Sequence, residues 1–488
     1  MSPQTAISAT LLLPLAGSVL ALAFGRRPNL REIATLLAAA GTLAAVASLT
    51  PAVLAGRRPG LELFEILPGL PLAFALEPLG LLFALVAAGL WIVTTCYSIG
   101  YMRGSGEGHQ TRYYACFALS IAAALGVALS ANLLTLFVCY EALTLSTYPL
   151  VTHHGDERAR RGGRTYLAVL MFTSIGLLLL AVLWTWQLAG TLDFRPGGIL
   201  ADKAGPGALG LLLALYAFGT GKAALMPFHR WLPAAMVAPT PVSALLHAVA
   251  VVKVGVFTVL KVAIYVFGID LLHETGIGLG LAYAAAVTVL VASLVALRQD
   301  NLKARLAYST VSQLGYIVLG AGLASPWSVL GGGMHIAMHA LGKITLFFCA
   351  GAIYVAAHKT EISEMRGIGR TMPVTTFAFL LASLSVIGLP PFGGTWSKWF
   401  LVMGAVESRQ IVLVSLLMIS SLLNIAYLVP IAVRGFFYAP VGSSRNPGIA
   451  EAPLFCLVPL CLTAAGCIAL FFFADPIYRL LLPIVQAH

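Results

Sequence analysis

The sequence predicts an all-α integral membrane protein with about fourteen transmembrane helices, and three observations support this. Of 488 residues, 59% are hydrophobic and only 10% are charged, which is typical of polytopic membrane proteins. The apolar residues form runs of about 20, the length that crosses a bilayer as a helix. Several runs contain lysine or histidine, which are costly inside a membrane and usually mark function.

The apolar runs define the spans and leave no segment long enough for a soluble nucleotide- or flavin-binding domain. The expected spans are 5–24, 31–55, 76–100, 112–131, 132–152, 165–189, 207–227, 241–266, 276–297, 303–323, 329–357, 372–396, 411–433 and 452–474. We divide the chain into three N-terminal helices with a short external hairpin (1–110), a first five-helix repeat (111–270), a second (271–435) and a C-terminal helix (436–488). The hairpin is expected at 57–75, where apolar and polar residues alternate around Pro68 and Gly69.

The basic residues indicate an orientation. Eighteen lysines and arginines lie in loops that follow odd-numbered spans, against five after even-numbered spans: Arg57, Arg58, Arg195, Lys203 and Arg409. By the positive-inside rule the odd loops are cytoplasmic and both termini lie on the opposite side. We expect a bacterial inner membrane protein with periplasmic termini. This distribution accounts for most of the net charge of +11, so nucleic-acid binding is not expected.

The sequence shows no clear signal peptide and no cysteine motif for a disulfide framework or a redox centre. The first apolar run has no basic segment before it and is followed by Arg26 and Arg27, which favours a retained helix over a signal peptide. All seven cysteines lie in apolar runs without a CxxC motif, which argues against a disulfide framework or an iron–sulfur site. No cofactor is expected on this chain.

Two spans are interrupted beside a lysine. Gly219 and Gly221 flank Lys222 in the seventh span, and a Pro-Pro-Phe-Gly-Gly run precedes Lys398 in the twelfth. Broken helices beside ionisable residues are typical of transporter ion sites. Because the two lysines are five spans apart, the repeats that contain them (spans four to eight and nine to thirteen) would be inverted relative to each other.

The ionisable residues inside the spans are mostly potential cations. Glu141 is the one acid deep in a span, because Glu77 and Asp475 lie near span ends, within reach of water. Burial disfavours a charged amine, and so does a second cation nearby. Some of the buried lysines should therefore be neutral part of the time, as a proton relay requires. The residues concerned are Lys222, His247, Lys253, Lys261, His335, His339, Lys343 and Lys398.

One helix carries three of these residues on a single stripe. His335, His339 and Lys343 are spaced at i, i+4 and i+8, so they lie within about 80° of each other over about 12 Å. Each alone would be read as a core polar group, but three together favour a polar track. Lys261 lies nearer the end of its span and can snorkel to the interface, so we leave it out of the track.

Metal and haem readings are weaker. Histidines at i and i+4 suit zinc, but no HExxH motif or acidic residue completes such a site. A bis-histidine haem between the eighth and eleventh spans is an alternative, and the neighbouring lysines make that pocket strongly cationic.

Four stretches resemble one known family. They are YEALTLSTYPLV, GTGKAALMPFHRWLPAAMVAPTPVSALLHAVAVVKVGVF, MHIAMHALGKITLFFCAG and the broken span that ends at Lys398. They are similar to the antiporter-like membrane subunits: the L, M and N types of respiratory complex I, their counterparts in membrane-bound hydrogenases, and the A and D types of Mrp cation/proton antiporters. The resemblance covers about residues 75–430 and implies fourteen helices, inverted five-helix repeats and broken helices seven and twelve.

The resemblance also implies proton-relay roles. Glu141 matches the glutamate that partners the seventh-helix lysine, here Lys222. His247 and Lys253 match connecting positions on helix eight. His335, His339 and Lys343 match the central track, and Lys398 the exit residue. Lysine at 398, rather than the glutamate of the M type, and an end soon after the fourteenth span make the chain most similar to the D type of Mrp antiporters or a complex I-like paralogue.

The function expected from this resemblance is proton or Na⁺/H⁺ translocation within a multisubunit membrane complex. That complex is either a complex I-like redox-driven pump, such as an NADH-quinone oxidoreductase, or an Mrp-type antiporter. Expected partners are homologous antiporter-like subunits, small hydrophobic membrane subunits and, in a redox complex, iron–sulfur and flavin subunits of a peripheral arm. The membrane half of a gradient-powered inorganic-carbon uptake system is an alternative, and a quinone- or haem-binding redox subunit is a weaker one.

Overall fold

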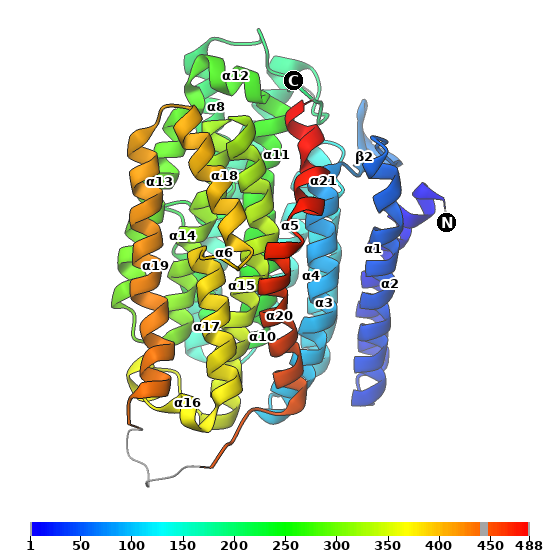
Figure 1. Cartoon of the computed structure of the whole chain (residues 1–488). Helices are drawn as coiled ribbons and strands as arrows, with labels where there is room; N and C mark the ends of the chain where they lie inside the picture. The colour runs from blue at the N-terminus through cyan, green and yellow to red at the C-terminus, as the bar shows by residue number, and fades with distance from the viewer. Residues whose placement is uncertain (1, 440–447, 487–488) are drawn as a thin grey trace.

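The computed structural model describes residues 2–439 and 448–486, except for the side chains of residue 67 and residues 246–249. It is a bundle of helices that run in roughly one direction (Figure 1). Within the described ranges, eleven helices are long and apolar enough to cross a membrane, or twelve if the bent pair Val251–Phe267 and Ile269–Thr275 forms one span. This confirms the predicted helical membrane architecture. The number falls short of fourteen because the remaining expected spans are short or broken.

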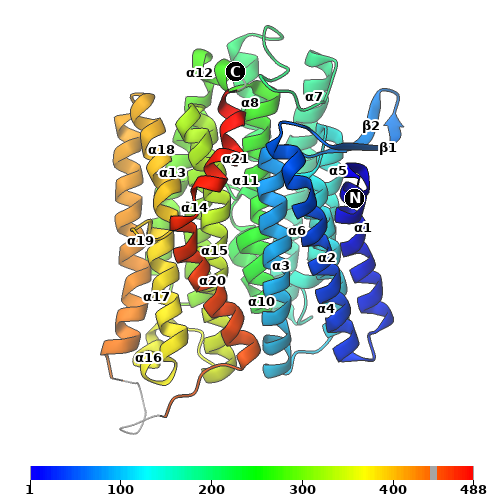
Figure 2. The same ribbon diagram turned by 45° about the vertical axis from the view of Figure 1, so that its right-hand side comes forward.

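The N-terminal helices and a β-hairpin form one edge of the bundle. Helices α1 (Pro3–Ala23) and α2 (Pro28–Leu54) pack antiparallel there (Figure 2). Strands β1 (Gly60–Leu67) and β2 (Leu70–Ala75) then pair antiparallel, with Gly60 opposite Ala75. Gly69 has φ +74° in the turn between them, a conformation that glycine adopts without strain.

The next helices build the first half of the bundle. They are α3 (Pro78–Gly104), α4 (Gln110–Ala128), α5 (Leu133–Val151), α6 (Glu157–Thr173) and α7 (Leu179–Ala189), and the π-helical turn η1 (Ser174–Leu178) joins the last two. The side chain of Asn132 accepts a hydrogen bond from the backbone N–H of Thr135 at 2.8 Å, an N-cap that starts α5 directly after α4.

A segment of short helices follows and surrounds Lys222. It comprises α8 (Pro206–Gly219), η2 (Gly221–Ala223), α9 (Trp231–Ala234), η3 (Ala235–Val237) and α10 (Thr240–Val242). From α10 a rod continues through η4 (Ser243–Ala250), α11 (Val251–Val262) and η5 (Ala263–Phe267) to α12 (Ile269–Thr275). Both η4 and η5 are π-helical, a distortion that often occurs at functional sites.

The second half is built around one long helix, α15 (Pro326–Ala357), which is buried along most of its length. Its neighbours include α14 (Leu302–Leu323), α17 (Pro373–Ile387), α18 (Gly394–Glu407) and α20 (Leu454–Phe472). The remaining elements are α13 (Ile277–Arg298), η6 (Ile362–Met365), α16 (Ile368–Thr371), α19 (Ile411–Phe437) and α21 (Asp475–Gln486). Helix α15 therefore lies in the core of this half, and it carries the stripe of His335, His339 and Lys343 there.

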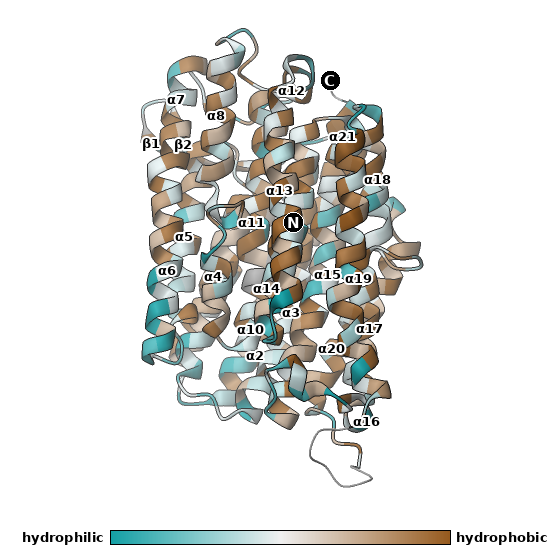
Figure 3. Cartoon of the chain, turned by 90° about the vertical axis from the view of Figure 1, so that its left-hand side faces the viewer, coloured by the Kyte–Doolittle hydropathy of each residue, from teal (hydrophilic) through white to brown (hydrophobic). Residues whose placement is uncertain are grey.

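The two ends of the bundle differ in charge. We call the end with β1, β2 and α12 the hairpin end, and the opposite end, with α10 and α16, the basic end (Figure 1). Hydrophilic residues gather on the basic-end turns of α6 (Figure 3), where the sequence Glu157–Arg164 contains four arginines.

Candidate functional site

The helix break at Lys222 depends on close backbone packing. Helix α8 ends at Gly219, and Lys222 lies on the single turn η2. The indole N–H of Trp231 donates to the carbonyl of Gly221 at 2.8 Å, which stabilises the break. A Cβ on Gly221 would lie 2.2 Å from Oγ1 of Thr173, so a side chain at 221 would push α6 away. The glycine therefore brings the lysine-bearing turn against α6.

The Lys222 ammonium is held by helix α5. It is completely buried and donates to the carbonyl of Tyr140 at 2.8 Å and to Oγ1 of Thr144 at 2.6 Å. It also lies 3.2 Å from the centroid of the Tyr140 ring, where a cation is attracted by the π electrons. Hydrogen bonds thus replace part of the hydration that the charged amine loses.

Glu141 is close to this lysine but is not its contact partner. Among the described residues the two form no ion pair, although the Glu141 charge acts on Lys222 electrostatically. Both carboxylate oxygens of Glu141 are buried and receive no hydrogen bond from the described residues. The direct pairing implied by the resemblance is therefore not formed in this conformation.

Lys253 connects the first half of the bundle to the second. Its Nζ lies 2.6 Å from Nδ1 of His339, joining α11 to α15. At this distance an ammonium donates to an unprotonated imidazole nitrogen. On the other side of α11, a Cβ on Gly255 would lie 2.2 Å from the carbonyl carbon of Lys222. The segment around Lys253 is therefore packed directly against the break that carries Lys222.

His335 and His339 lie one turn apart with stacked rings. Their centroids are 5.4 Å apart at an interplanar angle of 19°. Nδ1 of His335 is 2.9 Å from Oγ of Ser397 on α18, and its ring also stacks on Tyr316 of α14 at 5.6 Å. The two histidines thus extend the contact from Lys253 to the residue directly before Lys398.

The two remaining lysines lie at the two ends of this stripe. Lys343 is completely buried and donates to Oγ of Ser309 at 2.5 Å. Lys398 is 8% exposed and donates to the carbonyl of Ile387 at 2.9 Å. Its Nζ also lies 4.7 Å from the centroid of the Tyr316 ring. Each amine therefore has its own oxygen acceptor.

The structure brings five of the eight predicted residues into one polar region: Lys253, His335, His339, Lys343 and Lys398. Lys222 lies apart from them, and only the backbone of its turn packs against α11 at Gly255. Glu141 lies close to Lys222. His247 belongs to η4, and its side chain lies outside the described residues.

The expectation for Lys261 was wrong. Lys261 does not snorkel to the interface: its side chain is 1% exposed, and its Nζ lies 3.0 Å from Oε1 of Glu77, which is itself 8% exposed. Lys261 also donates to the carbonyl of Ser130 at 2.8 Å. The sequence places both residues near span ends, but the hairpin and the loop with Phe194 cover them, and Phe194 lies 4.5 Å from the ammonium.

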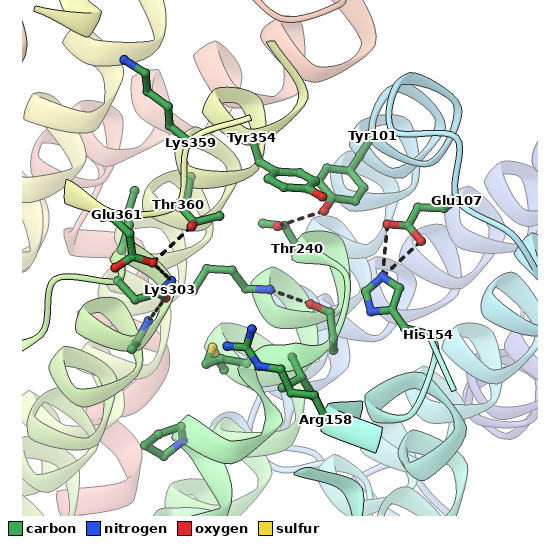
Figure 4. A pocket seen from close by; sticks show the side chains of 18 of the residues that line it. Tyr101, Glu107, His154, Arg158, Thr240, Lys303, Tyr354, Lys359, Thr360 and Glu361 are labelled. Carbon is green, nitrogen blue, oxygen red and sulfur yellow. Dashed lines mark hydrogen bonds and ion pairs between the residues drawn. The ribbon is translucent and has the colours of Figure 1, made fainter. Parts of the chain in front are cut away.

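A polar cavity of about 430 Å³ opens at the basic end, close to α10 and the end of α15. Figure 4 shows the side chains that line it, among them Lys303, whose Nζ donates to the carbonyl of Ala238 at 2.5 Å. The hydroxyls of Thr240 and Tyr101 form a hydrogen bond of 3.4 Å in the same wall. Residues of both charge signs surround the cavity, which suits water and small ions better than an apolar ligand.

Glu107 and His154 form a loop ion pair at this cavity. Nε2 of His154 lies 3.2 Å from Oε2 of Glu107. The hydrogen bond to Glu107 raises the pKa of His154 above its usual value. Burial tends to raise the pKa of Glu107, but the bond and charge of His154, with His153 and Lys303, lower it overall. Burial lowers the pKa of His153 to about 4, so His154 is the charged member of the two histidines.

Several residues of the site escaped the sequence analysis. Tyr140, Thr144, Ser309, Tyr316 and Ser397 supply the oxygens and rings that hold the lysines. Hydroxyl residues are common in membrane helices and often bond their own backbone, so nothing in the sequence distinguishes these. The position of Tyr140, directly before Glu141, was the one available signal.

The comparisons with known proteins show the family and the fold of the chain. Residues 130–424 match the family model described as NADH:quinone oxidoreductase/Mrp antiporter, transmembrane. The chain is 32% identical over 400 residues to NADH-quinone oxidoreductase subunit N of Desulforudis audaxviator, covering 78% of each. It is 26% identical to the D subunit of the Na⁺/H⁺ antiporter of Alkalihalophilus pseudofirmus, covering 79% of this chain and 77% of that one.

Other relatives are longer. The chain is 33% identical to hydrogenase-4 component B of Escherichia coli, over 63% of this chain and 47% of that protein. It spans about half the length of several of its curated relatives.

Solved structures show the same fold. A chain of the Mrp complex from Dietzia sp. superposes with a TM-score of 0.87 at 21% identity, covering 100% of this chain and 97% of that one. A chain of the membrane-bound sulfane sulfur reductase, an archaeal respiratory complex, superposes with a TM-score of 0.86 at 23% identity, covering 99% and 97%. The match to the family model covers more than half of the sequence. The chain therefore belongs to the family of NADH:quinone oxidoreductase and Mrp antiporter membrane subunits.

Proposed function

We propose that this chain is an ion-translocating subunit of a multisubunit membrane complex and moves protons, or exchanges H⁺ for Na⁺. The observation that carries this is the contact of 2.6 Å between Lys253 and His339 at the centre of the buried track. An amine hydrogen-bonded to an imidazole can pass a proton between two groups that both titrate. Relatives named as quinone oxidoreductase and Na⁺/H⁺ antiporter subunits support the assignment.

The route begins at the polar cavity of the basic end. That cavity reaches Thr240, at the start of the rod that continues into the bundle through η4 and α11 and carries Lys253. From Lys253 the route passes to His339 and divides along α15 toward Lys343 and toward His335 with Lys398. Glu141 lies at the other broken span, where its charge acts on Lys222.

We further propose that the chain crosses the membrane fourteen times and that ten of these crossings form two inverted five-helix repeats. The eleven candidate spans, α8, the bent pair and the broken α17–α18 segment together give fourteen. Two matching features support the repeats. Asn132 caps α5 and forms an isolated antiparallel β-bridge with Asp193. In the same way, Asn301 caps α14 and forms an isolated antiparallel β-bridge with Glu361. In each case the bridge joins the start of a repeat's second helix to the loop after its third helix, at opposite ends of the bundle (Figure 1).

The two broken spans also match. Lys222 lies over the ring of Tyr140 from α5, and Lys398 lies over the ring of Tyr316 from α14. Helices α5 and α14 are the second helices of the two repeats. By the positive-inside rule the basic end faces the cytoplasm of a bacterial inner membrane, and the chain termini lie on the other side.

The partners follow from the family. We expect homologous antiporter-like subunits and small hydrophobic subunits, with iron–sulfur and flavin subunits if the complex is redox-driven. Lipid or such subunits would cover the exposed apolar side chains of α19, among them Ile411, Met418 and Leu422. The chain itself supplies the ion route, and we assign no cofactor to it.

The test is purification of the native complex in mild detergent, with identification of its companions and assays for iron and flavin. Homologous membrane subunits should be found in every case. Iron–sulfur and flavin companions indicate a redox-driven pump, and small hydrophobic companions without cofactor indicate an Mrp-type antiporter. A chain that purifies without any homologous subunit, and whose vesicles show no coupled ion transport, would contradict the proposal.

A further inference from the structure

A second group of buried charges lies at the hairpin end, away from the track. The Lys261 ammonium on α11 is 3.0 Å from Oε1 of Glu77, the residue that precedes α3, and it donates to the carbonyl of Ser130 at 2.8 Å. It also faces the rings of Phe194 at 4.5 Å and Phe257 at 5.4 Å. An ionisable pair within a membrane protein is a functional candidate by default.

Helix α11 connects this pair to the track. Lys253, Phe257 and Lys261 are spaced at i, i+4 and i+8, so they share one side of the helix over about 12 Å. Phe257 lies between the two lysines and is completely buried against Phe83 of α3, with ring centroids 5.1 Å apart. An ion that leaves Lys253 toward the hairpin end must therefore pass an aromatic barrier and then a second lysine.

Two cavities lie beside the ion pair at the hairpin end. A small cavity of about 30 Å³ is lined by Arg58, Glu77, Ser130, Phe194 and Tyr265, among others, which is room for one or two water molecules. A second cavity of about 190 Å³ shares Arg58 and Tyr265 with it. Arg58 is exposed, and its guanidinium lies 5.5 Å from the Tyr265 ring centroid.

The backbone leaves space for the carboxylate. A Cβ on Gly80 would lie 2.4 Å from the carbonyl oxygen of Ala128 and 3.2 Å from Oε2 of Glu77. Glycine at this position therefore lets α3 touch α4 and at the same time makes room for Glu77. The position of the carboxylate against Lys261 depends on this close approach.

The charges at this end oppose the passage of a cation. Lys261 and Arg58 contribute two positive charges and Glu77 one negative charge around the small cavity. Fixed positive charges exclude protons and other cations from membrane pores. The Glu77 carboxylate holds the Lys261 amine in place at 3.0 Å, and the Phe257–Phe83 contact adds an apolar barrier in series.

We propose that Glu77, Lys261 and Arg58, together with Phe257, close the hairpin end of α11 against ions. They are positioning residues. Because they block the path along α11 to the hairpin end, ions that reach Lys253 move along α15 toward Lys398. The inference rests on the proposed ion-translocating function and deepens it, since an open path here would let ions cross without driving, or being driven by, the partner subunits.

Passive proton leak of the complete complex tests the closure, measured in vesicles with a pH-sensitive dye and an imposed potassium diffusion potential, without any driving reaction. Lys261→Met leaves the Glu77 carboxylate beside the cavity with one cation fewer. We expect the leak to rise at least about tenfold, because one unit charge at contact distance changes a barrier by more than that factor. Lys261→Arg keeps the charge and should leak like the wild type.

The double variant Glu77→Met with Lys261→Met shows whether a leak in Lys261→Met comes from the unpaired carboxylate or from a destabilised fold. Apolar side chains of similar size commonly replace a buried ion pair without loss of stability, and they should also restore the low leak. Arg58→Gln provides a variant at an exposed position, where folding is not at stake, and should raise the leak. Its matched control is Arg57→Gln, since Arg57 is also exposed and lines the larger cavity together with Arg58, but does not line the small cavity beside Glu77.

A wild-type leak in assembled Lys261→Met and in Arg58→Gln would overturn the proposal, and so would an equal rise in Arg57→Gln. If Lys261→Met fails to assemble, the Arg58→Gln and Arg57→Gln comparison still decides. The proposed function is tested separately by coupled transport in a Glu141→Gln variant. If Glu141→Gln transports ions normally while Lys261→Met and Arg58→Gln still leak, the proposed route is wrong and the proposed closure stands.

Discussion

The Lys253 ammonium lies 2.6 Å from Nδ1 of His339 and joins the two halves of the helix bundle inside the membrane. Both residues are buried, Lys253 completely and His339 to all but 2%. A buried amine normally needs a charged partner, yet here the acceptor is an imidazole. The proposed relay rests on this contact, because an amine and an imidazole can each hold or release a proton.

Lys253→Met should interrupt the relay while leaving the fold intact. Methionine keeps the length of the side chain and removes the proton-carrying group. Coupled ion transport in membrane vesicles should fall by at least about a hundredfold, the contribution typical of a positioned acid or base. Thr258→Val is the matched control, because Thr258 is buried on the same helix and donates to its own backbone at Val254. Normal transport in Lys253→Met would remove this residue from the route.

Glu141→Gln should abolish coupled transport without loss of stability. The carboxylate oxygens receive no hydrogen bond from the described residues, so the amide loses no hydrogen bond, and removal of a buried charge offsets the lost interaction with Lys222. Thermal unfolding should occur at the wild-type temperature or above it. Glu62→Gln, on the exposed side of β1, serves as the control. Wild-type flux in assembled Glu141→Gln membranes would disprove its role beside Lys222.

Lys398→Ala should block ion transfer at the far end of the track. Alanine removes the amine that donates to Ile387 and lies over Tyr316. Lys398→Glu restores a titratable group and should keep part of the flux, since the M-type relatives are expected to carry glutamate there. Proton release on the side opposite the basic end is the quantity to measure. Equal rates in the wild type and Lys398→Ala would show that the exit lies elsewhere.

Gly255→Ala should displace the turn that carries Lys222. The added Cβ would lie 2.2 Å from the carbonyl carbon of Lys222, so α11 or η2 must shift. Overpacking of this kind costs about 1–3 kcal/mol. Gly210→Ala is the control, because no atom lies within 4 Å of its Cβ position. The two variants are compared by thermal unfolding in detergent, and equal midpoints would show that the contact at 255 is easily relieved.

The loop pair Glu107–His154 should make stability depend on pH. The pKa of His154 is raised in the folded protein. Its contribution to folding stability is therefore fully present below the ordinary histidine pKa near 6.5, and it is lost as the pH rises through the folded pKa. The pKa of Glu107 is lowered. Its contribution to folding stability is therefore present above the ordinary glutamate pKa and is lost as the pH falls through the folded pKa. The wild type should therefore exceed His154→Gln in stability mainly in mildly acidic solution.

This difference should be small, no more than about 1 kcal/mol, because His154 is partly exposed. It should shrink toward zero by about pH 9. Lys303 also acts on the pair and is present in both proteins, and His153, whose pKa is about 4, stays neutral over this range. A constant offset between wild type and variant at all pH values would indicate that His154 contributes packing rather than charge.

The amino-acid sequence alone determined the class of protein and much of its candidate site. Apolar runs of membrane-spanning length predicted the helices, and the cost of burying charges singled out Lys222, Lys253 and Lys343 as residues with a role. These inferences depend on local composition and on helical spacing, which a single sequence contains. The family assignment from four sequence stretches was confirmed by the family match over residues 130–424.

The tertiary structure alone decided which groups touch. It placed Lys222 against Tyr140 and Thr144 rather than in an ion pair with Glu141, and it buried Lys261 against Glu77 although both lie near span ends in the sequence. The physical reason is that a buried charge takes whichever oxygen the packing of distant helices brings within about 3 Å. Lys261 and Glu77 are far apart in the sequence, so only the folded bundle could bring them together.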